Sequence, residues 1–187
     1  MANRNTQGFG LVPAGTLGST PATSGQGKYK IDAGYGTTIY QGGAVASSAG
    51  YIIDGQTTDA PVLGVLNGIF YNAATTLKPT FANFYKTPIT PANSEDIDAF
   101  VFDNPQQQYV VAIDAALAQS GYLETYDMNA SAGSDTTGRS TSTLDHDDTS
   151  ADAASFRLLR SAEDPENDEN AAFRSVVVCI NLIELQS

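Results

Sequence analysis

The chain contains no tryptophan, one cysteine and one histidine, and its hydrophobic stretches are short. A single cysteine, Cys179, cannot form an internal disulfide, which excludes a disulfide-stapled secreted scaffold. We expect Cys179 to be a small buried hydrophobic residue in a protein made in a reducing cytoplasm. The first residues lack the apolar core of a signal peptide, and no run of about 20 apolar residues follows. We therefore expect neither export nor contact with a membrane.

Positive charge is also scarce, with nine Lys and Arg residues against 21 Asp and Glu residues and a net charge of −12. Residues 1–94 carry five basic and three acidic residues, whereas residues 95–187 carry four basic and 18 acidic residues. An acidic surface repels a phosphate backbone, so direct binding of nucleic acid is not expected. This asymmetry favours a protein that turns a mildly basic front towards a partner and an acidic body towards water.

Residues of the kinds that carry catalysis are few and do not form a recognised motif. His146 lies in Asp145-His146-Asp147-Asp148, but a hydrolase also needs a nucleophile beside its base, and no nucleophile motif is present. Cys179 lies among valines, where a thiol is normally inert. We expect no catalytic residues and no cofactor, and the protein is predicted not to be an enzyme.

Two acidic stretches could attract a cation, but neither has recognisable ligand spacing. An EF-hand that starts at Asp145 would need glycine and glutamate where Ser150 and Phe156 stand. Solvated loops and no metal site are therefore expected, and a bound Ca²⁺ stays open as an alternative. The candidate acids are Asp145, Asp147, Asp148 and Asp152 in one stretch and Asp164, Glu166, Asp168 and Glu169 in the other.

Residues 1–27 are rich in Gly, Pro, Thr and Ser, and they contain too little apolar surface to become ordered alone. We predict a flexible N-terminal arm that orders against a neighbouring subunit, with a disordered terminus as the alternative. Its apolar anchors would be Phe9, Leu11, Val12 and Leu17. The remainder, residues 28–187, is predicted to be a single domain.

From Lys28 onwards, short β-branched and aromatic runs alternate with turn signals, which is typical of an all-β protein. We predict a small antiparallel β-barrel or sandwich with one or two short helical turns and an extended N-terminal arm. The Ser/Thr/Asp-rich stretch 131–152 is predicted to be a polar connection, with a helical turn at 150–154. The predicted strands include residues 29–31, 51–53, 62–71, 99–102, 109–113, 156–160 and 173–185.

The segment Ala60–Asn72 is the most informative of these strands because both of its faces are apolar. Alternation places Val62, Gly64, Leu66, Gly68 and Phe70 on one face, which predicts a strand buried on both sides. Two glycines on one face indicate a bend or the close approach of another backbone. Gly64 and Gly68 are therefore expected to be structural.

Six sets of residues follow one another in a fixed order: 61–65 with 68–71, 81–85, 101–105, 137–140 with 144–145, 154–158 and 176–181. Together they resemble a family of small β-rich structural proteins of tailed bacteriophages, especially short-tailed marine ones. The resemblance implies a capsid decoration, or cement, protein that binds the outer surface of the major capsid protein lattice and stabilises the DNA-filled head. Its partners would be the major capsid protein and neighbouring copies of itself, in a homo-oligomer on the exterior of the virion.

The arm, the basic front and the region of Arg139 are where we expect contacts with the capsid or with neighbouring copies. The expected contact residues are Arg4, Phe9, Leu11, Val12, Leu17, Lys28, Lys30 and Arg139.

The alternative function is a phage tail or host-contact β-domain, with glycan binding as one form of it. It is motivated by nine tyrosines and by the polar stretch 131–152. Most of these tyrosines fall in strand patterns with apolar neighbours, which favours core packing over a sugar platform.

Overall fold

The protein is all-β, as the sequence predicts. A computed structural model describes residues 5–18, 25–56, 61–129, 133–149, 154–168 and 170–186. Strands make up 49 % of the structure, and helical structure in the described ranges is limited to short 3₁₀ turns. These turns are η1 (Ala92–Ser94), η2 (Gln119–Gly121) and η3 (Glu184–Gln186). The strands are β1 (Val12–Thr16), β2 (Gly27–Ile31), β3 (Ala44–Ser48), β4 (Tyr51–Asp54), β5 (Gly64–Asn72), β6 (Pro79–Ala82), β7 (Ile97–Phe102), β8 (Gln107–Ile113), β9 (Thr125–Asn129), β10 (Gly133–Ser134), β11 (Arg139–Ser140), β12 (Thr143–Thr149), β13 (Phe156–Ser161) and β14 (Arg174–Ile180).

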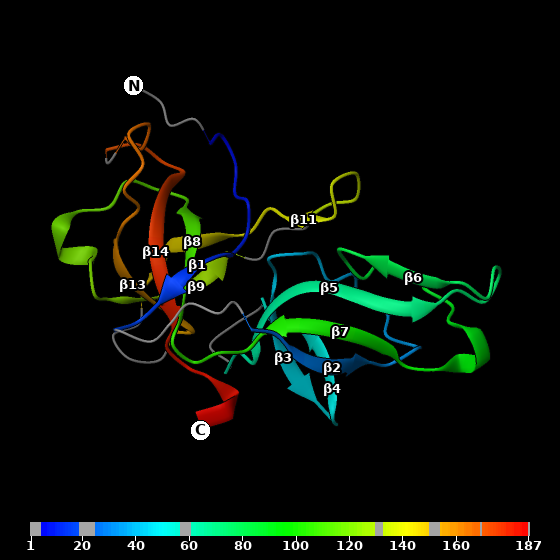
Figure 1. Ribbon diagram of the computed structural model, residues 1–187. Coiled ribbons are helices and arrows are strands. Elements are labelled where there is room, and N and C mark those ends of the chain that lie inside the picture. Colours follow the sequence, from blue (N-terminus) through cyan, green and yellow to red (C-terminus); the bar gives the residue numbers. More distant parts are fainter. Residues whose placement is uncertain are drawn as a thin grey trace.

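The first sheet closes into a five-stranded barrel, shown to the left in Figure 1. Its strand order is β8-β12-β9-β13-β14, and β14 pairs back onto β8 in antiparallel register from Arg174↔Ile113 to Cys179↔Gln108. β1 adds to β8 from outside the ring. Closure removes the free edges of the five ring strands, so that β1 is the edge strand of this sheet. The barrel core contains Tyr109, Val111, Ile113, Tyr126, Leu144, Phe156, Leu158, Val176 and Val178.

The second sheet lies beside the barrel, to the right in Figure 1, in the order β2-β7-β5-β3-β4 with β6 also paired to β5. It is curled around a core of its own. That core contains Ile31, Ile39, Val45, Ile52, Leu63, Leu66, Ile69, Tyr85, Ile97, Ala99 and Val101.

The start of β5 and the residues before it form a wall shared by the two cores. Val62 and Val65 belong to the barrel core, whereas Leu63 and Leu66 belong to the second core. This confirms the prediction that the segment is buried on both sides. Strict alternation is wrong even before Asn67, because Val62 and Leu66, predicted on one face, enter different cores. A bulge between Leu66 and Gly68 shifts the register with β7 again.

The predicted N-terminal arm is part of the body over residues 8–17, which corrects the expectation of a flexible arm that becomes ordered against a neighbouring subunit. β1 pairs with β8, and Leu11 is 1 % exposed in the barrel core. Gly8 lies against the backbone of the loop before β12 and Gly10 against the backbone of Gly42, so close that side chains at either position would clash. Backbone pairing and close glycine packing compensate for the low apolar content on which the prediction relied. Residues 1–4 and 19–24 of the predicted arm lie outside the described residues.

The polar stretch 131–152 also differs from its prediction, because residues 143–149 form β12 inside the barrel sheet. Leu144 is completely buried and is the one large apolar anchor of this strand. Backbone pairing with β8 and β9 completes it. The helical turn expected at 150–154 falls almost entirely outside the described residues.

We expect Gly64→Val to lower the free energy of unfolding by about 1–3 kcal/mol, the usual cost of overpacking. A Cβ atom at Gly64 would collide with the Phe102 carbonyl oxygen and lie 2.7 Å from Cγ1 of Val101. Gly36→Val is the matched control, because a Cβ atom at Gly36 meets nothing within 4 Å. Urea unfolding followed by circular dichroism checks this, and equal midpoints for the two variants would contradict it.

Candidate functional site

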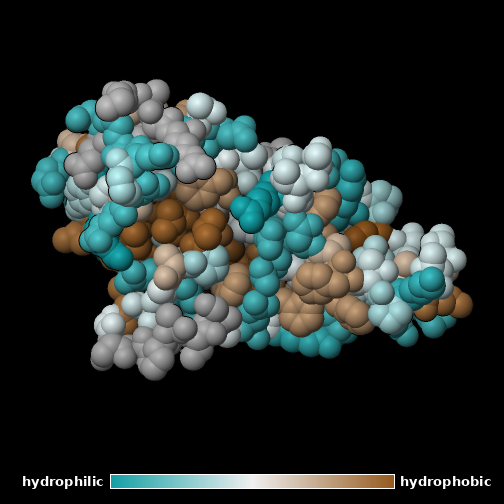
Figure 2. Space-filling model, turned by 45° about the horizontal axis from the view of Figure 1, so that its top comes forward, coloured by the Kyte–Doolittle hydropathy of each residue, from teal (hydrophilic) through white to brown (hydrophobic). Residues whose placement is uncertain are grey.

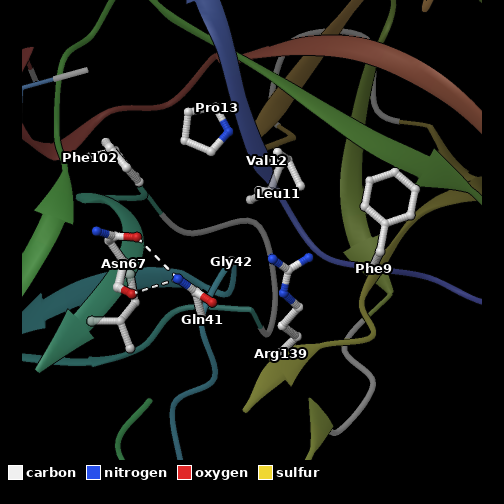
Figure 3. Close-up of a pocket in the computed structure, with 10 residues that line it drawn as sticks. Phe9, Leu11, Val12, Pro13, Gln41, Gly42, Asn67, Phe102 and Arg139 are labelled. Atoms are coloured by element: carbon white, nitrogen blue, oxygen red, sulfur yellow. Dashed lines mark hydrogen bonds between the residues drawn. The ribbon is translucent and has the colours of Figure 1, made fainter. Parts of the chain in front are cut away.

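A small cleft lies where the two sheets meet, and several of the predicted contact residues surround it (Figure 3). Its volume is about 100 Å³, which is below the roughly 300–1,000 Å³ of pockets that bind drug-sized molecules. A space of this size suits one side chain of a partner. The lining residues are Phe9, Leu11, Val12, Pro13, Gln41, Gly42, Leu66, Asn67, Phe102 and Arg139.

The N-terminal segment and β7 supply the apolar wall of this cleft. Phe9 is half-buried and Val12 is 41 % exposed, whereas Phe102 from β7 is 8 % exposed. The amide of Leu11 donates to the Gly42 carbonyl oxygen at 2.8 Å, which holds the segment in place. Rigid apolar side chains at the rim are the kind of surface that anchors a partner residue.

A hydrogen-bonded floor below the wall connects the second sheet to the hairpin β10–β11. Nε2 of Gln41 donates to the backbone oxygen of Asn67 at 3.0 Å and to its Oδ1 at 3.2 Å. The backbone of Gln41 pairs with β11, accepting from the Ser140 amide and donating to the Gly138 carbonyl oxygen, both at 2.9 Å. Gln41 therefore ties the bulge of β5 to the hairpin that carries Arg139.

The hairpin β10–β11 packs on the rings of Tyr40 and Phe84, which we call the aromatic shelf. The rings of Tyr40 and Phe84 stack with centroids 5.6 Å apart and an interplanar angle of 6°. Gly133 lies against the Tyr40 ring, and Gly138, with a φ of +70°, lies against Phe84. Asp135 in the same hairpin accepts from the Tyr40 hydroxyl at 2.7 Å. This packing places Arg139 at the edge of the cleft.

Arg139 is the charged group of the cleft, and in Figure 3 its guanidinium points towards Leu11 and Val12. Within the described residues its side chain makes no ion pair or hydrogen bond. By contrast, Lys86 pairs with Asp135 at 2.8 Å. An uncompensated guanidinium in a protein of net charge −12 is suited to a carboxylate supplied from outside.

The structure brings together four of the predicted contact residues and separates the others. Phe9, Leu11, Val12 and Arg139 surround the cleft, although Leu11 is a core residue that supports the wall from inside. Leu17 follows β1 and donates its amide to the Gln106 carbonyl oxygen. Arg4 lies outside the described residues.

Lys28 and Lys30 lie elsewhere, on the outer face of the second sheet. Their ammonium groups contact Asp98 at 2.7 and 2.5 Å. Burial of Asp98 opposes its ionisation, but hydrogen bonds from both lysines outweigh burial and lower the pKa of this carboxyl group.

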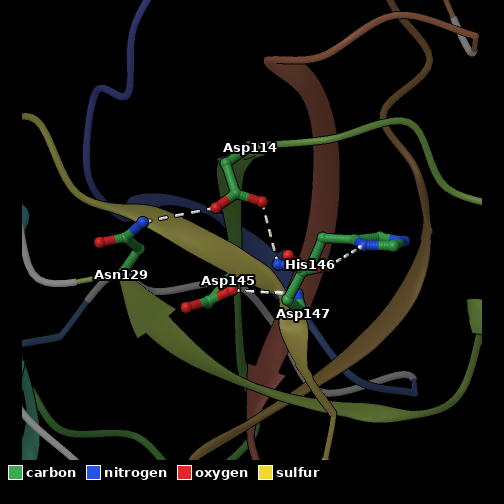
Figure 4. A network of polar contacts seen from close by, with 5 residues as sticks. All are labelled: Asp114, Asn129, Asp145, His146 and Asp147. Carbon is green, nitrogen blue, oxygen red and sulfur yellow. Dashed lines mark hydrogen bonds and ion pairs between the residues drawn. The ribbon is translucent and has the colours of Figure 1, made fainter.

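His146 belongs to a polar network at the end of the barrel (Figure 4). Its backbone amide donates to Oδ1 of Asp114 at 2.9 Å, and its Nδ1 lies 3.1 Å from Oδ1 of Asp147. Asp145 accepts from the Asp147 amide, and Asn129 donates to Asp114 at 3.4 Å. These contacts fasten β12 to its neighbouring segments.

The other residues considered for chemistry are placed as follows. Cys179 is 7 % exposed, which confirms the expected burial, and burial raises the pKa of its thiol. Among the described residues, no group of three or more His, Cys, Asp or Glu side chains is arranged to hold a metal ion. The side chain of Asp148 and all of Asp152 and Glu169 fall outside them, so the alternative of a bound cation stays a prediction.

Within the described ranges, no helix is long and apolar enough to cross a membrane.

No family model, curated protein or solved structure matches this chain. The cleft must therefore be interpreted from its own residues. Sequence reasoning pointed to Phe9, Val12 and Arg139 but missed Gln41 and Asn67. Their polar side chains carry no local pattern that reveals a partner 26 residues away.

We expect Gly133→Val to displace the hairpin, because an added side chain would overlap the Tyr40 ring. The hydrogen bond from the Ser140 amide to Gln41 should weaken as a result. Hydrogen exchange at Ser140 should then become at least about tenfold faster, since protection follows the free energy of local opening. Unchanged exchange at Ser140 would contradict the role of the shelf, with Gly36→Val as the control.

We expect Asp98→Asn to destabilise the protein by about 0.5–1 kcal/mol at neutral pH, as is typical of exposed ion pairs. Since the folded pKa of Asp98 is lowered, its contribution is present above the unfolded value of about 3.9 and is lost as the pH falls through the folded value. The difference between wild type and variant should therefore vanish in strong acid. Unfolding curves measured at several pH values check this, and a pH-independent difference would contradict it.

Proposed function

We propose that this chain is a decoration protein of a tailed-bacteriophage head, which binds the outside of the major capsid protein lattice. The observation that carries the proposal is the cleft between the two sheets, where an apolar wall meets the uncompensated guanidinium of Arg139. Such a cleft suits an apolar side chain beside a carboxylate on a protein partner. The resemblance of the sequence to phage head proteins supports the same function.

The fold supports a passive, load-resisting role. The closed barrel and the shared wall at β5 make one stiff body, in which the cleft has fixed walls. A stable interface buries on the order of 1,600 Å², so the cleft would be the anchor of a larger contact surface. Many copies, each bridging neighbouring capsid subunits, would together resist the pressure of packaged DNA.

The charge distribution supports an orientation on the particle. Residues 95–187 carry 18 of the 21 acidic residues, which favours turning most of this surface to water. Arg139 is a cation within this acidic half. Negative charge on the partner surface opposite Arg139 would guide docking and exclude wrong orientations.

Purified particles of the phage that encodes this chain provide the direct test. Mass spectrometry should find the protein in amounts comparable to the major capsid protein, and labels on intact particles should cover the whole shell. Absence from the particle, or a copy number far below that of the capsid protein, would refute the proposal.

The same labelling distinguishes a decoration protein from the alternative, a tail or host-contact domain, which would give signal at one vertex. Tyr85, Tyr109 and Tyr126 are at most 1 % exposed. These tyrosines pack in the two cores, which reduces the support for a sugar platform built from tyrosine.

We expect Arg139→Glu to weaken binding to undecorated capsids by at least about tenfold, because it opposes the partner's carboxylate. Lys78→Glu is the matched control, since Lys78 is an exposed cation outside the cleft. Co-sedimentation with capsids measures both affinities. Equal losses for the two variants would indicate a general charge effect and would contradict a role for the cleft.

A further inference from the structure

The outer face of the second sheet carries exposed aromatic side chains that its own core does not use. Phe81 on β6 is 63 % exposed, and Phe70 on β5 and Phe100 on β7 are half-buried. Their chain neighbours Ile69 and Ala99 point the other way, into the second core. Figure 2 shows hydrophobic surface on this lobe, to the right. Large exposed aromatic side chains gathered on one face are typical of an interaction surface.

The aromatic side chains form a preorganised platform. The ring centroids of Phe81 and Phe100 lie 6.1 Å apart at an interplanar angle of 36°. Gly68 lies beneath them, and a Cβ atom there would be only 2.8 Å from Cζ of Phe81. Gly68, which directly follows the bulge in β5, thus leaves room for the Phe81 ring on the surface.

One edge of the same face is cationic. The register aligns Lys30, Asp98, Phe70 and Phe81 in one row across β2, β7, β5 and β6. Lys28 lies beside Phe100 in the next row. Lys28 and Lys30 have side chains that are 59 % and 49 % exposed, and Asp98 fixes their ammonium groups. The face therefore runs from a lysine edge on β2 to an aromatic edge on β6.

We propose that this face is the contact between two copies of the chain, related by a two-fold axis that passes between β5 and β7. Such an axis lays the lysine edge of each copy over the aromatic edge of the other. A two-fold interface must be self-complementary, and lysine over phenylalanine satisfies this requirement through cation–π contacts. The inference rests on this face alone and not on the proposed capsid role.

The chemistry of the two edges favours a second copy over other occupants. A uniformly acidic partner would match Lys28 and Lys30 but would leave Phe81 facing carboxylates. A uniformly aliphatic partner would match Phe81 but would bury two ammonium groups without the cation–π contacts that offset their desolvation. A second copy presents both kinds of edge in the required order.

Analytical ultracentrifugation of the full chain over a range of concentrations tests the proposal. The wild type should show a monomer–dimer equilibrium, and Phe81→Ser should raise the dimer dissociation constant by at least about 30-fold, as expected for an aromatic hot spot. Leu77→Asn is the matched control. Leu77 is 73 % exposed, and its φ of +54° suits asparagine.

A second variant keeps the test decisive if Phe81→Ser unfolds. Lys28→Glu with Lys30→Glu places carboxylates over the partner's aromatic edge and should also raise the dissociation constant by at least about tenfold. A wild type that stays monomeric at every concentration would overturn the proposal. So would a dimer that both folded variants leave unchanged, or one that Leu77→Asn weakens as much as Phe81→Ser.

The capsid proposal can fail separately from this one. Arg139→Glu should leave the dimer constant unchanged while it weakens capsid binding, because Arg139 belongs to the cleft and not to the aromatic face. Loss of the dimer in Arg139→Glu would show that the contact between copies lies at the cleft and would overturn this assignment.

Discussion

The antiparallel pairing of β5 with β7 is the constraint on which the rest of the structure depends. It aligns Val65 with Phe102, and both side chains enter the barrel core. It aligns Leu66 with Val101, and both enter the second core. Gly64 permits this pairing because only a residue without a Cβ atom fits against the Phe102 carbonyl oxygen. Two cores that could have belonged to separate units therefore share one pair of strands.

The bulge at Asn67 determines which side chains of β5 point to each face of the β5–β7 pair. Before the bulge, the face that carries Val65 and Phe102 is covered by the barrel. After it, the same face carries Phe70 and Phe100 away from both cores. The bulge lies at the cleft, where Gln41 binds it. The cleft and the aromatic face are therefore two consequences of one irregularity in a core strand, which fits the frequent occurrence of bulges beside functional sites.

The two proposed contact surfaces differ in chemistry and suit different partners. The cleft accommodates one side chain beside the uncompensated guanidinium of Arg139. The outer face is aromatic, and the lysines along its edge are already partly neutralised by Asp98. A dimer formed through the outer face would carry two clefts on one body. Binding at both clefts would strengthen attachment to a repeating lattice without any new contact, since the second event becomes intramolecular.

The sequence by itself determined the all-β class, the double burial of the segment before and into β5, and the buried state of Cys179, because local alternation and apolar runs report burial directly. Only the tertiary structure decided that Leu11 enters the barrel core, that residues 143–149 form a strand and that Arg139 stands beside Phe9. Each of these depends on a backbone partner far along the chain, as when the Leu11 amide meets Gly42. Local composition can show that a segment is polar or rich in glycine, but the choice of a distant hydrogen-bonding partner is made by the folded chain.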